Sequence, residues 1–135
     1  MKDTLVPGLV SEVAHTVDDG RAIAFMGDEL RVYATPCIVH DLEYACRDLI
    51  LEHLDEGQDT VGARVEIEHL KPTPMGAAVR HVVTVEEVKG RSVTCAVEVH
   101  DDLEKVATAR HTRFVVEIAR LKKAVAQKRS ALDQA

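Results

Sequence analysis

The stretch TPCIVHDLEYACRDLILEHL, residues 35–54, decides the fold of this 135-residue chain. Its apolar side chains recur at about 100° per residue, which predicts one long helix with a buried face. The residues on that apolar arc are Ile38, Leu42, Ala45, Cys46, Leu49 and Ile50. Thr35 is a good N-cap residue and Pro36 suits the first helical position, so the start of the expected helix is well marked.

One carboxylate, Glu43, lies at one side of this apolar arc, between Val39 and Leu54. An unpaired buried charge is very costly, so the side chain must be partnered, be protonated or serve a function. The expected helix therefore carries the first candidate for chemistry.

The hydrophobic period changes from 3.6 to 2 after the helix. In residues 61–69 apolar side chains alternate with glycine or charged residues, which predicts a half-buried strand. The apolar set is Val61, Ala63, Val65 and Ile67. His69 is in phase with this set, so the strand is expected to point an imidazole toward the core side.

Three more strands are expected, at 77–88, 91–100 and 104–116. The Lys89-Gly90 and Asp101-Asp102 pairs are short turn signals, so these strands should form an antiparallel meander. One face of the last strand is expected to carry Ala107, Ala109, His111, Arg113 and Val115.

The two ends of the chain complete the pattern. Residues 9–17 predict a first strand, and residues 21–34 predict a loop with a short helical turn that covers whatever site the main helix borders. Residues 117–132 predict a C-terminal helix with a thin apolar stripe. We expect this helix to pack on the sheet edge or to fray at its end.

A long helix between a first strand and four antiparallel strands describes the hot-dog architecture. This is an α+β fold in which a twisted antiparallel sheet wraps a long central helix. The length predicts a single domain, residues 1–135. Unpaired strand edges and the remaining apolar surface favour a homodimer or a dimer of dimers, joined edge to edge.

The composition excludes several classes of function. A net charge of −6 argues against non-specific nucleic-acid binding, which needs clustered Lys and Arg. No apolar run is long enough to span a membrane and the N-terminus lacks the apolar core of a signal peptide, so we expect no membrane association and a cytoplasmic location. The three cysteines and seven histidines show no metal-binding or disulfide spacing, so no metal is expected.

Glu43 on the helix and His69 on the strand are expected to converge where the two elements meet. A carboxylate and an imidazole in a partly apolar place can shift each other's pKa, which suits acid–base or nucleophilic chemistry. Each also has an ordinary structural explanation. Glu43 could be an edge residue that reaches solvent, and His69 a strand-end histidine bonded to a backbone carbonyl.

Three segments carry a resemblance to a known family, namely TPCIVHDLEYAC, VGARVEIEHLKPTPMG and ARHTRFVV. Over roughly residues 10–118 the chain resembles the fluoroacetyl-CoA thioesterase family, which are hot-dog acyl-CoA hydrolases. The resemblance implies Thr35, Glu43 and His69 as catalytic residues. It also implies that Gly62 places the thioester and that Arg113 lies near the site. The implied substrate is an acyl-CoA, with coenzyme A as part of the substrate and no other cofactor.

The reaction implied by the resemblance is thioester hydrolysis. Glu43 would be a general base for water or a nucleophile that forms an anhydride, with His69 orienting it or moving protons. Thr35 could cap the helix, bind the carbonyl or attack it, and the Gly62 N–H or a helix N-terminus could stabilise the oxyanion. We expect a small-to-medium acyl group on CoA or on an acyl carrier protein. The segment before the helix lacks the phenylalanine-rich cover of the fluoroacetyl-specific enzyme, so fluorine discrimination is not expected.

Spacing limits how these residues can meet. Thr35 and Glu43 are about 12 Å apart along one helix and about 80° apart around it, so they cannot hydrogen-bond within it. Gly62 and His69 are about 23 Å apart on an extended strand and of opposite parity. We therefore expect a site at a dimer interface. Two other functions stay open: a hot-dog enoyl-thioester hydratase or dehydratase, and a non-catalytic acyl-CoA-binding protein.

Overall fold

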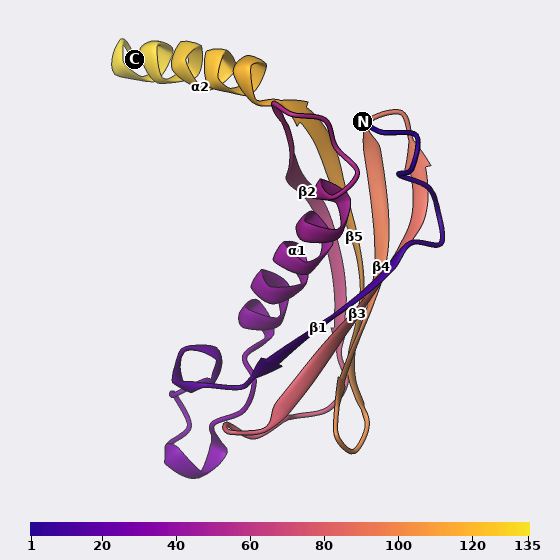
Figure 1. The fold of residues 1–135 in the computed structure, drawn as a ribbon. Helices are drawn as coiled ribbons and strands as arrows, with labels where there is room; N and C mark the ends of the chain where they lie inside the picture. The colour runs from indigo at the N-terminus through magenta and orange to yellow at the C-terminus, as the bar shows by residue number, and fades with distance from the viewer.

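Helix α1, Thr35–Leu51, lies across one face of a five-stranded antiparallel sheet (Figure 1). The structure is a computed structural model that describes all residues, 1–135. The strands are β1 Val10–Thr16, β2 Gln58–His69, β3 Ala78–Lys89, β4 Ser92–Asp101 and β5 Lys105–Glu117. Helix α2, Ile118–Asp133, follows β5. The predicted order of a strand, a long helix, four strands and a C-terminal helix is confirmed.

The strand order across the sheet is β1-β3-β4-β5-β2, and every neighbouring pair is antiparallel. β3, β4 and β5 form the predicted meander. In the turn between β3 and β4, Gly90 takes a φ of 61°, a conformation that glycine adopts at little cost. β1 and β2 are the edge strands, so one side of the β2 backbone is left without a strand partner.

The core lies between the apolar face of α1 and the facing side of the sheet. Ile38, Leu42 and Ile50 of α1 are completely buried. Burying one such side chain stabilises the fold by about 1.5–3 kcal/mol, so this face holds the helix on the sheet. The sheet contributes small and β-branched side chains, including Val83, Val93, Val97, Val99 and Ala107.

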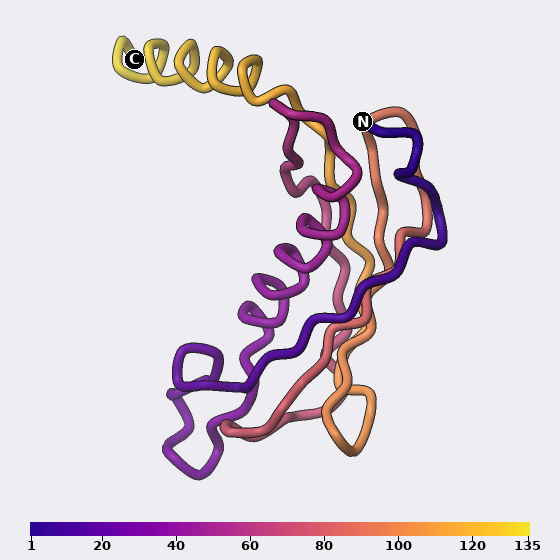
Figure 2. Tube along the Cα trace, in the orientation of Figure 1, coloured from indigo at the N-terminus to yellow at the C-terminus, as the bar shows by residue number.

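The segment between β1 and α1 folds into a loop beside the first turns of the helix (Figure 2). It contains two single turns of 3-10 helix, η1 Asp19–Arg21 and η2 Asp28–Leu30. The predicted loop with a short helical turn is therefore confirmed.

The first turn of α1 differs from the prediction. The N-cap residue is Ala34, whose side chain makes no capping hydrogen bond, and Thr35 is the first residue inside the helix. The backbone N–H of Ala34 donates to the carbonyl of Arg21 at 2.8 Å, which fixes where the chain enters the helix. The expectation that Thr35 caps the helix is therefore wrong, and its hydroxyl is available for another partner.

A β-bulge in β2 corrects the predicted strand phase. The pairing with β5 shifts by one residue between Gly62 and Arg64, so Ala63 has no partner on β5. Gly62 and His69 both pair with buried residues on the same face of β5. The predicted opposite parity of these two residues is wrong, and Val61 lies on the other face, where it is 37% exposed.

Helix α2 projects away from the sheet and has no buried residue (Figure 1). The expectation that it packs on the sheet edge is wrong, although the helix itself is formed. Its apolar stripe is exposed at Ile118, Leu121, Val125 and Leu132. Neither α1 nor α2 combines the length and the apolar character that a membrane-spanning helix needs.

A buried polar cluster ties the segment before α1 to the helix. Asp41 of α1 is buried and accepts hydrogen bonds from Tyr33 Oη at 2.5 Å and from Arg21 Nε at 2.8 Å. Burial raises the pKa of Asp41, but the hydrogen bonds from Arg21 and Tyr33 outweigh it and hold that pKa below its ordinary value. Asp41 lies outside the predicted apolar arc, so its burial was not predicted.

His81 of β3 completes this cluster. Because Tyr33 gives its single hydroxyl proton to Asp41, the Nε2–H of His81 donates to the Tyr33 oxygen at 3.0 Å. The Nδ1 atom of His81 then carries no proton, and it is buried without a partner. Burial accordingly lowers the pKa of His81 to about 4.

We expect the free energy of unfolding to fall as the pH drops from ~6.5, the ordinary pKa of histidine, to about 4, the pKa of folded His81. Folded His81 stays neutral down to about pH 4, whereas in the unfolded chain it takes up a proton near pH ~6.5. The unfolded state binds more protons in this window, so up to about 3 kcal/mol of unfolding free energy is lost between these limits. Urea titrations at several pH values measure the slope of the unfolding free energy against pH. His81→Gln should flatten it and His40→Gln, at an exposed histidine, should not; equal slopes in all three proteins would contradict this assignment.

Candidate active site

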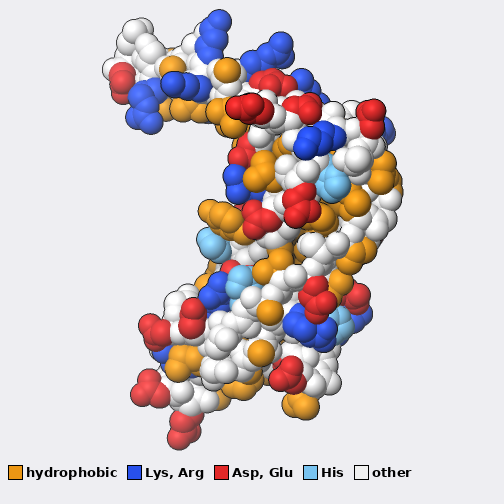
Figure 3. Space-filling view, viewed as in Figure 1, with side chains coloured by type: hydrophobic (Ala, Val, Ile, Leu, Met, Phe, Trp, Pro, Cys, Tyr) orange, Lys and Arg blue, Asp and Glu red, His pale blue; other side chains and the backbone are white.

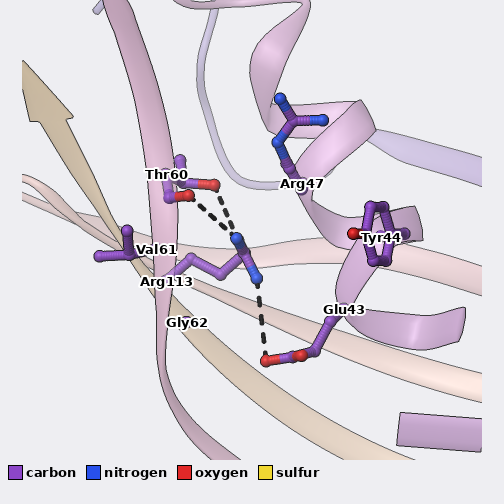
Figure 4. A pocket seen from close by; sticks show the side chains of 7 residues that line it. All are labelled: Glu43, Tyr44, Arg47, Thr60, Val61, Gly62 and Arg113. Atoms are coloured by element: carbon purple, nitrogen blue, oxygen red, sulfur yellow. Dashed lines mark hydrogen bonds and ion pairs between the residues drawn. The ribbon is translucent and has the colours of Figure 1, made fainter. Parts of the chain in front are cut away.

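An open pocket of about 540 Å³ lies between α1 and β2 (Figure 4). Its lining residues are Glu43, Tyr44, Arg47, Thr60, Val61, Gly62 and Arg113. The structure thus brings together three of the residues singled out from the sequence: Glu43, Gly62 and Arg113.

Glu43 extends from α1 into this pocket, with its side chain 40% exposed. Its Oε1 atom lies 3.8 Å from His111 Nε2 and 4.0 Å from Arg113 Nη1. Both distances are too long for hydrogen bonds, and the Arg113 guanidinium attracts the carboxylate electrostatically. The carboxylate is therefore held near positive charge, while neither neighbour occupies its lone pairs.

Arg113 is buried beneath the pocket and is held mainly by Thr60. Its Nε donates to Thr60 Oγ1 at 2.7 Å, and its Nη2 donates to the Thr60 carbonyl at 3.0 Å (Figure 4). The third nitrogen, Nη1, lies 3.1 Å from His111 Nε2. Buried guanidinium groups need such partners, and β2 and β5 supply them here.

Gly62 makes room for the Glu43 carboxylate. A Cβ atom at this position would lie 2.6 Å from Glu43 Oε1 and 3.3 Å from His111 Cε1. Because the first contact is with the end of a flexible side chain, an added methyl group would displace the carboxylate more than it would disturb the fold. Only glycine lets Glu43 keep its observed position.

Gly62→Ala is therefore expected to slow any reaction at the Glu43 carboxylate by about 10- to 100-fold, because misplacing a reacting group by about 1 Å can cost that much. The melting temperature should change little. Gly20→Ala is a matched control, since its added Cβ would make only an ordinary van der Waals contact, 3.7 Å from Asp18 Oδ1. Full activity in Gly62→Ala would show that the carboxylate position does not matter.

Thr35 and His69 form a second pair. Thr35 Oγ1 lies 2.7 Å from His69 Nδ1, so the first turn of α1 is hydrogen-bonded to the last residue of β2. Burial lowers the pKa of His69, which keeps the imidazole neutral at pH 7. Its Nε2 atom is buried and has no partner within the chain.

The two clusters remain apart within one chain. No hydrogen bond or ion pair joins Glu43 to His69, so the predicted convergence of this pair is not found in a single chain. Thr35 and Glu43 occupy the same regular helix, about 12 Å apart. Within one chain, the carboxylate cluster around Glu43 is therefore separate from the hydroxyl–imidazole pair of Thr35 and His69.

His111 and Thr60 were not predicted as site residues. The alternation in β5 does place His111 and Arg113 on one face, as predicted, and both are buried. Thr60 lies before the stretch where the predicted strand began. A strand extended back to Gln58, as the structure shows, would have revealed it.

Comparisons with solved structures define the class of protein. A thioesterase superfamily member from Thermus thermophilus superposes with a TM-score of 0.89 at 25% identity, covering 98% of this chain and 99% of that one. A hot-dog-like protein from Thermanaerovibrio acidaminovorans superposes with a TM-score of 0.84 at 25% identity, covering 90% and 91%. The chain has the hot-dog fold of the thioesterase superfamily, which confirms the predicted α+β architecture.

The family follows from the sequence comparisons. The family model described as fluoroacetyl-CoA-specific thioesterase matches residues 17–119, and the chain belongs to that family. The fluoroacetyl-CoA thioesterase of Streptantibioticus cattleyicolor is 28% identical over 100 residues, which are 74% of this chain and 72% of that protein. The predicted resemblance is confirmed, and the protein is a thioester hydrolase.

Proposed function

We propose that this enzyme hydrolyses small-to-medium acyl-CoA thioesters at a site shared by two protomers. The observation that carries the proposal is the Glu43 carboxylate, exposed in an open pocket and held close to Gly62 without a hydrogen bond from His111 or Arg113. A base or nucleophile needs available lone pairs, and Glu43 keeps them.

Glu43 acts as the general base or as the nucleophile in the attack on the thioester carbonyl. It does so by taking a proton from water, whose oxygen then bonds the carbonyl carbon, or by bonding that carbon itself to form an anhydride. In both routes the C–S bond breaks and the CoA thiolate leaves. Water then hydrolyses the anhydride in the second route. Label found in the Glu43 side chain after single turnover in H₂¹⁸O identifies that route, because the general-base route places ¹⁸O only in the released acid.

Thr35 and His69 would come from the second protomer and face Glu43 across the interface. The Thr35 hydroxyl, 2.7 Å from His69 Nδ1, would bind the thioester carbonyl, and the neutral His69 ring would move a proton. Support comes from the separation of the two clusters along α1, which a second chain running in the opposite sense would close. Arg113 and Gly62 would complete the carboxylate side of the site.

The surface supports such a dimer. β2 is an edge strand, and Val61 and Val65 on it are each 37% exposed. The face in Figure 3 is hollowed between α2 and the segment before α1, with apolar side chains along α2 turned toward the hollow. Open edges and apolar surface of this kind are commonly covered by a second copy. A cytoplasmic location and the lack of a cofactor beyond CoA stay predictions from the sequence.

The test is thiol release from a panel of acyl-CoAs from acetyl to octanoyl, with the acyl carrier protein thioesters run in parallel. We expect turnover on the shorter CoA substrates and a dimer by gel filtration with light scattering. Ligand binding without turnover would favour a non-catalytic binding protein. Water addition to crotonyl-CoA without thiol release would favour a hydratase, and a monomer would overturn the shared site.

A further inference from the structure

We propose that His111 is a positioning residue that holds the Arg113 guanidinium away from Glu43 and so keeps the carboxylate free to react. The proposal rests on the proposed role of Glu43. His111 lies on β5, is 1% exposed, and contacts both the bulged strand β2, at Arg64, and the pocket-lining residue Arg113.

The contacts of His111 determine which ring nitrogen carries the proton. Nδ1 lies 2.7 Å from the backbone carbonyl of Arg64, the residue directly after the bulge. A carbonyl oxygen only accepts, so Nδ1 must carry the hydrogen. In the neutral ring Nε2 is then an acceptor. The bulge in β2 thus sets the hydrogen-bonding direction of a side chain on β5.

That acceptor faces Arg113. Arg113 Nη1 donates to His111 Nε2 at 3.1 Å, while Thr60 accepts from the other two guanidinium nitrogens. Three acceptors therefore hold the guanidinium, and Glu43 stays 4.0 Å from Nη1. Without the His111 acceptor, only Thr60 would restrain Arg113.

The groups around the imidazole favour its neutral form. The charged groups that face it are Glu43 from α1 and Arg113 from its own strand, and its register neighbour on β4 is the Cys95 thiol. Burial, together with the nearby Arg113 charge, lowers the pKa of His111. A protonated ring would present an N–H to the guanidinium and lose the contact.

Loss of the acceptor should affect the chemical step more than binding. Nη1 would be free to close the 4.0 Å gap and donate a short, charge-assisted hydrogen bond to Glu43. A carboxylate bound in this way is a weaker base and nucleophile, because its lone pairs and charge are engaged. Substrate contacts elsewhere would remain.

His111→Leu and His111→Gln test this directly, since Gln keeps an acceptor and Leu does not. His111→Leu should lower kcat about 10-fold with KM within about twofold, and should move the acid limb of the pH profile down by about one unit. His111→Gln should recover kcat to within about threefold of wild type. Equal losses in the two variants, or an unmoved acid limb in His111→Leu, would overturn the proposal.

A second measurement asks whether His111 acts through Arg113. In an Arg113→Gln background, His111→Leu should reduce kcat by less than twofold, because there is no guanidinium left to hold. A tenfold loss that persists in that background would overturn the positioning role.

A third readout does not depend on turnover. ¹⁵N NMR of the imidazole in the wild-type protein should show a neutral ring with its proton on Nδ1 at pH 7. A ring protonated at pH 7, or one carrying its proton on Nε2, would overturn the proposal even if the enzyme is active. A wild-type protein without thioester turnover would instead overturn the proposed function while leaving this result readable.

Discussion

Glu43→Gln is expected to lower kcat for acyl-CoA hydrolysis by about 10³-fold, within the range of about 10²–10⁴ that a general acid or base contributes. The amide has nearly the shape of the carboxylate but can neither take a proton from water nor attack the carbonyl. The flanking atoms, His111 Nε2 and Arg113 Nη1, are 3.8 and 4.0 Å away, so no hydrogen bond to them is lost. Steady-state thiol release measures the effect.

Glu52→Gln is the matched control for this substitution. Glu52 lies at the C-terminal end of the same helix, is exposed and does not line the pocket. Its removal should leave kcat within about twofold, since an anion near a helix C-terminus contributes only a few tenths of a kcal/mol. A Glu43→Gln enzyme with more than a tenth of wild-type activity would remove Glu43 from the reaction.

Most of the fold could be predicted because its signals are local. The change of period from 3.6 to 2 separates α1 from the strands, and the turn at Gly90 fixes the β3–β4 hairpin. Alternation placed the inward face of β5 correctly from Ala107 to Val115. Each of these features depends on residues within a few positions of one another.

The features that were missed depend on distant partners. Gly62, Ala63 and Arg64 continue the alternating pattern, and only the pairing with β5 reveals the bulge. The burial of Asp41 depends on Arg21 and Tyr33, which the preceding loop brings to the helix. No local pattern encodes such contacts, so a helix plot alone treats Asp41 as a surface residue.

The candidate site was predicted as a list but not as an arrangement. Glu43 and His69 each lie on a predicted element, yet their partners in one chain are His111 and Arg113 for the first and Thr35 for the second. A strand phase predicted without the bulge assigned Gly62 to the wrong face. A one-residue shift in pairing is enough to change which side chains meet across a sheet.

Removing the Thr35–His69 pair should cause a loss comparable to that of Glu43→Gln. The two side chains are joined at 2.7 Å, and the Nε2 atom of His69 is buried without a partner within the chain. His69→Ala should lower kcat about 10²–10³-fold through loss of proton transfer. Thr35→Val should lower it about 10²-fold, because the ring loses its partner and the carbonyl loses a donor.

The double variant decides whether the two residues act as one unit. If they do, Thr35→Val combined with His69→Ala should be no slower than His69→Ala alone, whereas independent roles would multiply the two losses. Thr4 and His53 offer a control pair of similar geometry, with Thr4 Oγ1 2.8 Å from His53 Nδ1 outside the pocket. His53→Ala should leave kcat within about twofold. Fully multiplicative losses at Thr35 and His69 would mean that their hydrogen bond serves the fold and that each side chain meets the substrate separately.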